Sequence, residues 1–203
     1  MSFQSLHRGL LVLALALAGA SQAAEPTHVR GEVVSVTKGG LVVREADGRR
    51  RNIQLDERSS VFDVSPTNLE AINENTYIGV AGVAASEGVV RAQGVLVFPE
   101  AARGQYEGAF PWDKKKGGSM TNATVTRRVV QRNGRAEIEV NYGKSKRLIQ
   151  IDRSTVFGAF VPGTPALVVP GAQVLVLAEP DAAGTGQRAG TVMVGRKGFK
   201  PPI

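Results

Sequence analysis

The chain has 203 residues, a formal net charge of +7 and no cysteine, and aromatic residues make up only 5% of it. Without cysteine the protein cannot be stabilised by disulfides, held by a thiolate metal centre or attached to lipid through a cysteine. Its many Val and Gly residues favour short strands joined by tight turns.

The N-terminal segment has the layout of a secretory signal peptide. His7 and Arg8 precede an apolar run at residues 10–20, and small residues around Ala23 follow it. The run is about half as long as a bilayer-spanning helix requires. It therefore predicts a cleaved signal at 1–23 and not a membrane anchor. We expect an exported protein, periplasmic or secreted, that does not span a membrane.

The residues after the signal predict three strands, a short helix and two more strands. Lys38-Gly39-Gly40 and Asp47-Gly48 supply turn residues between the first strands. Ser65 and Pro66 are typical of the start of a helix. This order is that of an OB-like barrel, in which a helix lies between the third and fourth strands. The predicted strands are 29–37, 41–45, 52–62, 77–84 and 89–98, and the helix lies within 65–72.

The second half repeats the first. Residues 53–56 (Ile-Gln-Leu-Asp) match 149–152 (Ile-Gln-Ile-Asp), and leaving out Glu57 aligns the following residues as well. Two tandem copies of one unit are therefore predicted. Prolines and glycines at 162–171 take the place of the helix, so that only a turn or two can form there. The predicted strands of this copy are 124–132, 135–142, 147–157, 173–178 and 189–194.

The predicted fold class is all-β, with two tandem OB-like, five-stranded β-barrels. The first barrel, at 24–100, carries the short helix, the second spans 122–203, and residues 101–121 form an ordered linker. A β-sandwich stays open as an alternative, because strand number and turn spacing do not separate the two architectures. Net charge is −2 over residues 28–100 and +7 over residues 122–203.

The linker carries the most distinctive side chains. Three aromatic residues predict a segment that packs against the barrels, since a flexible linker would expose them to water. Basic residues beside an aromatic ring also suit a polyanion or a sugar. The interpretation that we favour is loop charges for solubility, with the tryptophan wedged between the barrels. The residues proposed for a ligand or an interface are Tyr106, Phe110, Trp112, Lys114, Lys115 and Lys116.

Several short motifs lie in the linker and near the C-terminal residues: Phe98-Pro99-Glu100, Arg103-Gly104, Glu107-Gly108, Pro111-Trp112-Asp113, 119–125 (Ser-Met-Thr-Asn-Ala-Thr-Val), Val194-Gly195-Arg196 and Pro201-Pro202. With these motifs, nearly the whole mature chain resembles a family of exported bacterial proteins of unknown function, built on an OB-like domain and often labelled automatically as metal transporter permeases. The resemblance implies the fold and the compartment, and no catalytic residue. The permease label conflicts with a sequence in which no segment beyond the signal is long and apolar enough to span a membrane.

The mature chain has few side chains suited to catalysis or metal binding. It keeps one histidine, His28, so no metal site, cofactor or catalytic residue is predicted. The pairs Asp56/Arg58 and Asp152/Arg153 are interpreted as hydrogen-bonded barrel corners. We therefore expect a non-enzymatic binding or structural module for an unknown envelope ligand or protein. Polyanion or glycan binding by the basic second barrel and the linker is the alternative, and export makes nucleic acid an unexpected partner.

Overall fold

The computed structural model describes residues 26–130, 135–181 and 183–203, so the predicted signal peptide at 1–23 lies outside the described residues. The described chain is all-β, with short 3-10 helices of three residues each and none long and apolar enough to cross a bilayer. The strands are β1 (Thr27–Thr37), β2 (Gly40–Glu45), β3 (Arg50–Gln54), β4 (Ser60–Pro66), β5 (Tyr77–Ser86), β6 (Val89–Val97), β7 (Gly108–Trp112), β8 (Gly118–Val130), β9 (Ala136–Tyr142), β10 (Ser145–Ile151), β11 (Val156–Pro162), β12 (Gln173–Pro180) and β13 (Gln187–Gly195).

Strands β8, β9, β10, β6 and β5 form a closed five-stranded barrel. All neighbours are antiparallel except β10 and β6, which run parallel over three residue pairs, Leu148–Val89 to Gln150–Arg91. The closed ring is compatible with an OB-like fold and excludes a sandwich for this part of the chain.

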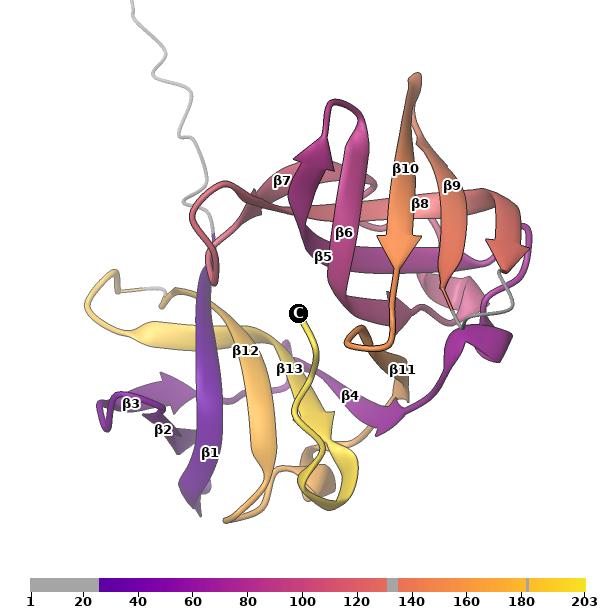
Figure 1. Cartoon of the computed structure of the whole chain (residues 1–203). Coiled ribbons are helices and arrows are strands. Elements are labelled where there is room, and N and C mark those ends of the chain that lie inside the picture. Colours follow the sequence, from indigo (N-terminus) through magenta and orange to yellow (C-terminus); the bar gives the residue numbers. More distant parts are fainter. Residues whose placement is uncertain (1–25, 131–134, 182) are drawn as a thin grey trace, which may run out of the picture.

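Strands β1, β2, β3, β13 and β12 follow the same order in a second ring. Here the parallel contact between β3 and β13 is a single residue pair, Gln54–Arg188. Residues 50–53 of β3 therefore extend past the N-terminal end of β13 without pairing to it, so the ring is partly open between these two strands, at what we call the seam. Figure 1 shows this group of strands below the closed barrel.

Each ring combines strands from both repeats. Strands β1–β3 are completed by β12 and β13, whereas β8–β10 are completed by β5 and β6. The barrels predicted in tandem at 24–100 and 122–203 are therefore not confirmed. The chain crosses between the rings after β4 and β11, which pair antiparallel from Phe62–Pro162 to Pro66–Gly158. Two equivalent repeats predict the same strands whether or not they exchange their last hairpins, so local sequence patterns do not reveal the exchange.

The strands predicted at 52–62 and 147–157 are each divided by a tight turn. In both turns an aspartate accepts a backbone hydrogen bond two residues on, Asp56 from Arg58 at 2.9 Å and Asp152 from Ser154 at 2.8 Å. The Ser59 hydroxyl donates to the carbonyl of Ala189 at 2.7 Å, as Thr155 does to Ala92 at 3.0 Å.

These turns correct the alignment of the repeats and explain the repeated Asp. Ser59 and Thr155 both lie three residues after the aspartate, and the same offset along the chain relates the 3-10 turns that begin at Leu69 and Pro165, so Glu57 aligns with Arg153 and no residue has to be left out. Each hydroxyl also accepts the N–H of its own aspartate, at 3.1 Å in the first turn and 3.2 Å in the second. The turns thereby fasten the strand that each ring receives from the other repeat.

The short helix predicted within 65–72 is not confirmed. Ser65 and Pro66 belong to β4, because pairing with β11 keeps them extended. A single 3-10 turn, Leu69–Ala71, follows and is capped by the Asn68 side chain. The second repeat has a similar turn at Pro165–Leu167.

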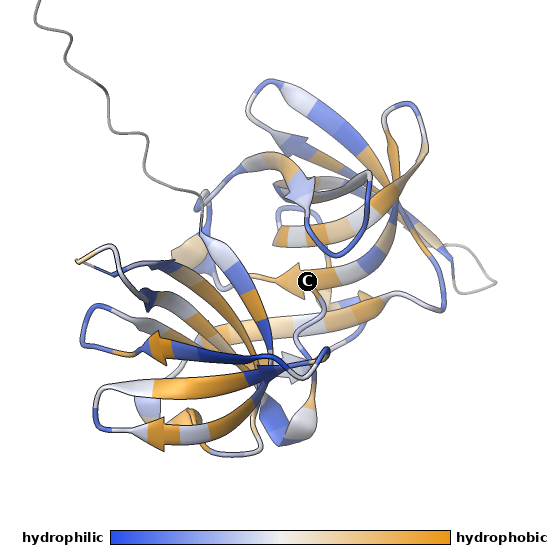
Figure 2. Ribbon diagram, turned by 90° about the vertical axis from the view of Figure 1, so that its left-hand side faces the viewer, coloured by the Kyte–Doolittle hydropathy of each residue, from blue (hydrophilic) through white to orange (hydrophobic). Residues whose placement is uncertain are grey.

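The apolar residues form one cluster inside each ring and a third between them. Figure 2 shows hydrophobic residues concentrated along the strands and hydrophilic residues at the hairpin turns. Phe160 lies at the centre of the third cluster, with ring centroids 4.9 Å from Phe62 and 4.6 Å from Phe98. The buried members of this cluster are Val64, Ala81, Leu96, Trp112, Phe160, Leu175, Met193 and Ile203.

Removing the Thr155 hydroxyl should destabilise the protein. Thr155 is 7% exposed, so Thr155→Val leaves the Ala92 carbonyl and the Asp152 N–H without that partner, at a cost of about 1–3 kcal/mol. Thermal unfolding should show a lower Tm, and Ser59→Ala should lower it less because Ser59 is half-buried. Ser60→Ala is the matched control, since Ser60 is exposed. An equal loss with Ser60→Ala would contradict the corrected equivalence of the turns.

The exchange of hairpins also predicts how a cut chain behaves. With a protease site inserted between Lys116 and Gly117 in the exposed β7–β8 turn, cleavage should give two fragments that co-elute in native buffer and separate in denaturant. Each fragment carries strands of both rings, so separation would require both to open. Fragments that separate in native buffer on size-exclusion chromatography would indicate independent tandem barrels.

Candidate functional site

The segment predicted as a linker extends the sheet of the closed barrel. Its strand β7 pairs with the first residues of β8, from Gly108–Asn122 to Trp112–Gly118. Trp112 is 5% exposed and belongs to the cluster between the rings. Its indole Nε1 is buried without a hydrogen-bond partner among the described residues. The tryptophan thus lies in the interface, which leaves little of it for a ligand to contact.

An ion cluster next to Trp112 joins this segment to β1. Arg30 donates two hydrogen bonds to the Asp113 carboxylate, at 2.6 and 2.8 Å, and His28 Nδ1 lies 3.3 Å from it. Arg30 Nε also donates to the Ile203 carbonyl at 3.0 Å. Partial burial opposes ionisation of Asp113, but the hydrogen bonds and charge of Arg30, together with His28, hold its pKa below the ordinary value.

The three lysines of the β7–β8 turn differ in environment. Lys114 places its ammonium 5.8 Å from the centroid of the Trp112 ring. Partial removal from water, and then the charge of Arg30, lower the pKa of Lys114 to about 8. All three lysines are exposed, and Lys114 differs from the other two in lying over the Trp112 ring.

The two other aromatic residues do not converge on this point. Tyr106 is 72% exposed in a left-handed conformation, with φ of 50°, and its carbonyl accepts from Asn122 Nδ2 at 3.0 Å. Phe110 is 44% exposed on β7, opposite Met120 of β8. The six residues singled out in the sequence are therefore divided between an interface (Trp112), its rim (Lys114) and exposed positions.

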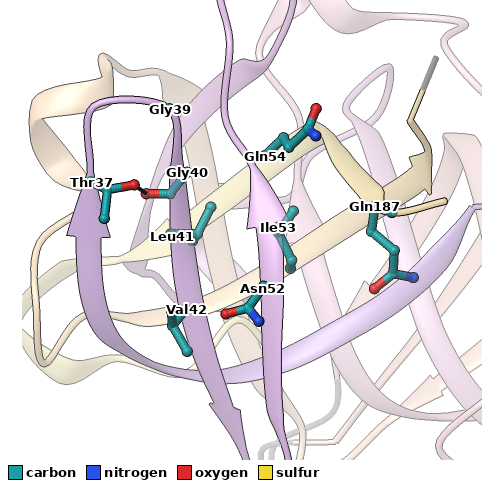
Figure 3. Close-up of a pocket in the computed structure, with 10 residues that line it drawn as sticks. Thr37, Gly39, Gly40, Leu41, Val42, Asn52, Ile53, Gln54 and Gln187 are labelled. Atoms are coloured by element: carbon teal, nitrogen blue, oxygen red, sulfur yellow. Dashed lines mark hydrogen bonds between the residues drawn. The ribbon is translucent and has the colours of Figure 1, made fainter. Parts of the chain in front are cut away.

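The seam between β3 and β13 holds a surface depression that the sequence did not reveal. It has a volume of about 340 Å³ and is bordered by the β1–β2 turn, by strands β2 and β3 and by the start of β13 (Figure 3). Thr37, Asn52, Gln54 and Gln187 provide hydroxyl and amide groups, and the residues lining it include no charged or aromatic side chain. Gln54 Nε2 also lies 3.5 Å from Asp181 Oδ2 in the β12–β13 loop.

This depression could not be found from sequence because it follows from incomplete ring closure. The residues that line it come from positions as far apart as Thr37 and Gln187. The sequence patterns include only part of its lining, namely Gly39 and Gly40 of the first turn and Ile53 and Gln54 of the repeated segment. In OB-fold proteins the face of the second and third strands, between the first hairpin turn and the last hairpin loop, binds oligonucleotides and oligosaccharides.

The basic run at 49–51 is largely paired within its own hairpin. Arg49 contacts Asp47 at 2.5 Å and Arg51 contacts Glu45 at 2.9 Å. Among the described residues, no group of three or more His, Cys, Asp or Glu side chains could hold a metal ion. Comparison of the chain with protein families, curated proteins and solved structures gave no match.

Removing the Lys114 charge should stabilise the protein at neutral pH. Because the folded pKa of about 8 lies below the ordinary 10.5, the unfolded chain binds more protons between these values, and stability rises with pH across that window. Lys114→Met should raise Tm at pH 7, by no more than about 2–4 °C since the side chain is partly solvated. The gain should disappear above pH 10.5.

Lys115→Met is the matched control, since Lys115 occupies the next exposed position of the same turn and does not share the contact of Lys114 with the Trp112 ring. The same rise in Tm for both variants, or a gain that persists at high pH, would contradict the effect assigned to Lys114.

Proposed function

We propose that the protein is a non-enzymatic, exported binding module whose ligand is a neutral glycan strand of the cell envelope, held on the open face of β2 and β3. The observation that carries this proposal is the uncharged depression at the seam of the partly open ring. It lies where OB-like barrels receive oligomeric ligands.

The chemistry of the depression supports a sugar. Amide groups of Asn52, Gln54 and Gln187 both donate and accept hydrogen bonds, as sugar hydroxyls require. A polyanion would call for cationic side chains, and a nucleic acid strand also for stacking aromatic rings. Neither kind of side chain lines the depression. Its open, shallow form suits a polymer that runs across the face more than a small molecule that is enclosed.

The linker is not the glycan-binding site in this proposal. Trp112 is buried in the interface, and Lys114 is partly desolvated beside Arg30. Lys114, Lys115 and Lys116 are all exposed to a polyanion, and polyanion binding is the competing function that the experiment tests.

The test is calorimetric binding of a neutral β-1,4-linked tetrasaccharide of N-acetylglucosamine to the full mature chain. The double variant Asn52→Ala/Gln54→Ala should weaken binding at least about tenfold, because each lost hydrogen bond contributes about 1 kcal/mol. Gln150→Ala is the matched control, since Gln150 is the repeat equivalent of Gln54 on the closed barrel.

Equal weakening by Gln150→Ala, or no binding of the neutral oligosaccharide, would contradict the proposal. Retention on heparin that is lost when Lys114, Lys115 and Lys116 are replaced by Gln, with no effect of the Asn52/Gln54 variant, would instead support the polyanion function.

A further inference from the structure

The closed barrel holds a half-buried arginine, Arg147, that makes no ion pair with any described carboxylate. Arg147 of β10 lies opposite Val140 of β9 and precedes the fully buried Ile149 by two residues, so its side chain belongs to the inner face of the barrel. It lies at the end of the barrel where the β5–β6 and β9–β10 hairpins lie together, since Leu148 donates its N–H to the Gly88 carbonyl at 3.0 Å.

The neighbours of Arg147 are hydroxyls and an aromatic ring. Its Nη1 donates to Thr121 Oγ1 at 2.6 Å and lies 3.4 Å from Ser119 Oγ, both on β8. The guanidinium carbon is 5.6 Å from the centroid of the Tyr142 ring. Thr121 is fully buried, whereas Arg147, Ser119 and Tyr142 are half-buried and reach the surface.

No carboxylate in the described part of the chain comes within 4.0 Å of Arg147. Glu107, the acid that reaches the neighbouring turn, accepts the N–H of Gly143 instead. A partly buried guanidinium without a counter-charge is unfavourable, because desolvation is not offset by an ion pair.

The first repeat shows the same position with its charge paired. Arg51 lies opposite Val43 on the β2–β3 hairpin, as Arg147 lies opposite Val140 on the β9–β10 hairpin. Two residues beyond these valines stand Glu45 and Tyr142, respectively. Glu45 binds Arg51 at 2.9 Å, so the second repeat has an aromatic ring where the first has the counter-ion.

We propose that Arg147, with Ser119 and Thr121, binds an oxyanion, a carboxylate or a phosphate, at this end of the closed barrel. A guanidinium has five N–H donors, and those of Nε and Nη2 are not engaged by any described residue, which leaves the edge that binds such groups in bidentate fashion. Because the hydroxyl of Ser119 accepts from Arg147, its own hydrogen is available to the anion. Tyr142 supports the guanidinium through its ring face.

This site is separate from the glycan face, since it is built from β8, β9 and β10 and uses no residue of the β3–β13 seam. The two proposals therefore fail independently. An anion could reach the site as a free ion or as part of a larger envelope molecule, and the shared chemistry is the oxyanion itself.

The test uses the full mature chain, titrated with sodium phosphate and, separately, with sodium acetate at constant ionic strength set by chloride. Binding is followed by the chemical shift of the Arg147 side-chain Nε–H and by Tm, which a ligand of the folded state raises. We expect saturable shifts with at least one of the two anions. Arg147→Gln should weaken that binding at least about tenfold, as expected for the loss of charge-assisted hydrogen bonds.

Two further variants keep the test independent of folding defects. Tyr142→Glu gives Arg147 the counter-ion that Arg51 has, so it should abolish anion binding while Tm without anion stays the same or rises. Arg51→Gln is the matched control and should leave anion binding unchanged. Anion effects that persist in both Arg147→Gln and Tyr142→Glu, or no saturable effect of either anion on the wild-type chain, would overturn the proposal.

Discussion

The pairing of β4 with β11 is the constraint on which the rest of the structure depends. These strands meet antiparallel, and Val64 lies opposite Phe160, its repeat equivalent, so that the two repeats are related by an approximate two-fold axis through this pair. Once the strands cross here, the hairpin after each of them reaches only the other ring. The two rings therefore share one sheet and a third apolar cluster, and they are held together without any disulfide.

The segment between the repeats contributes to the same interface. Trp112 fills the space between the rings, and Asp113 binds Arg30 of β1, so that a residue next to β8 of one ring is held to a strand of the other. The aromatic residues that suggested a binding site in this segment therefore do not act together: Trp112 packs between the rings, whereas Tyr106 and Phe110 are exposed. The different net charges of the two halves of the sequence cannot be assigned to one ring each, because each ring combines strands from both halves.

Local patterns predicted most strands and turns, because alternation along β9 and turn residues such as Lys38-Gly39 act within a few residues of chain. The repeat was also visible, although the Asp56 and Asp152 turns were needed to show that Glu57 is not an extra residue. The exchange, the short strand β7 and the seam depend on contacts between distant residues, which composition and periodicity do not record. The environment of Arg147 was hidden for the same reason, since it depends on Tyr142 standing where Glu45 stands in the other repeat.

The two rings differ at places that the crossing does not use. The turns that fasten the exchanged strands are chemically alike, with an aspartate and a hydroxyl in each. The ring contacts differ, with one residue pair between β3 and β13 against three between β10 and β6. The inner arginines differ too, since Arg51 pairs with Glu45 and Arg147 has no carboxylate partner in the part of the chain that the structure describes. The crossing depends on both turns, whereas the seam and the end of the closed barrel take no part in it, so a difference between the repeats at either place leaves the connection of the two rings intact.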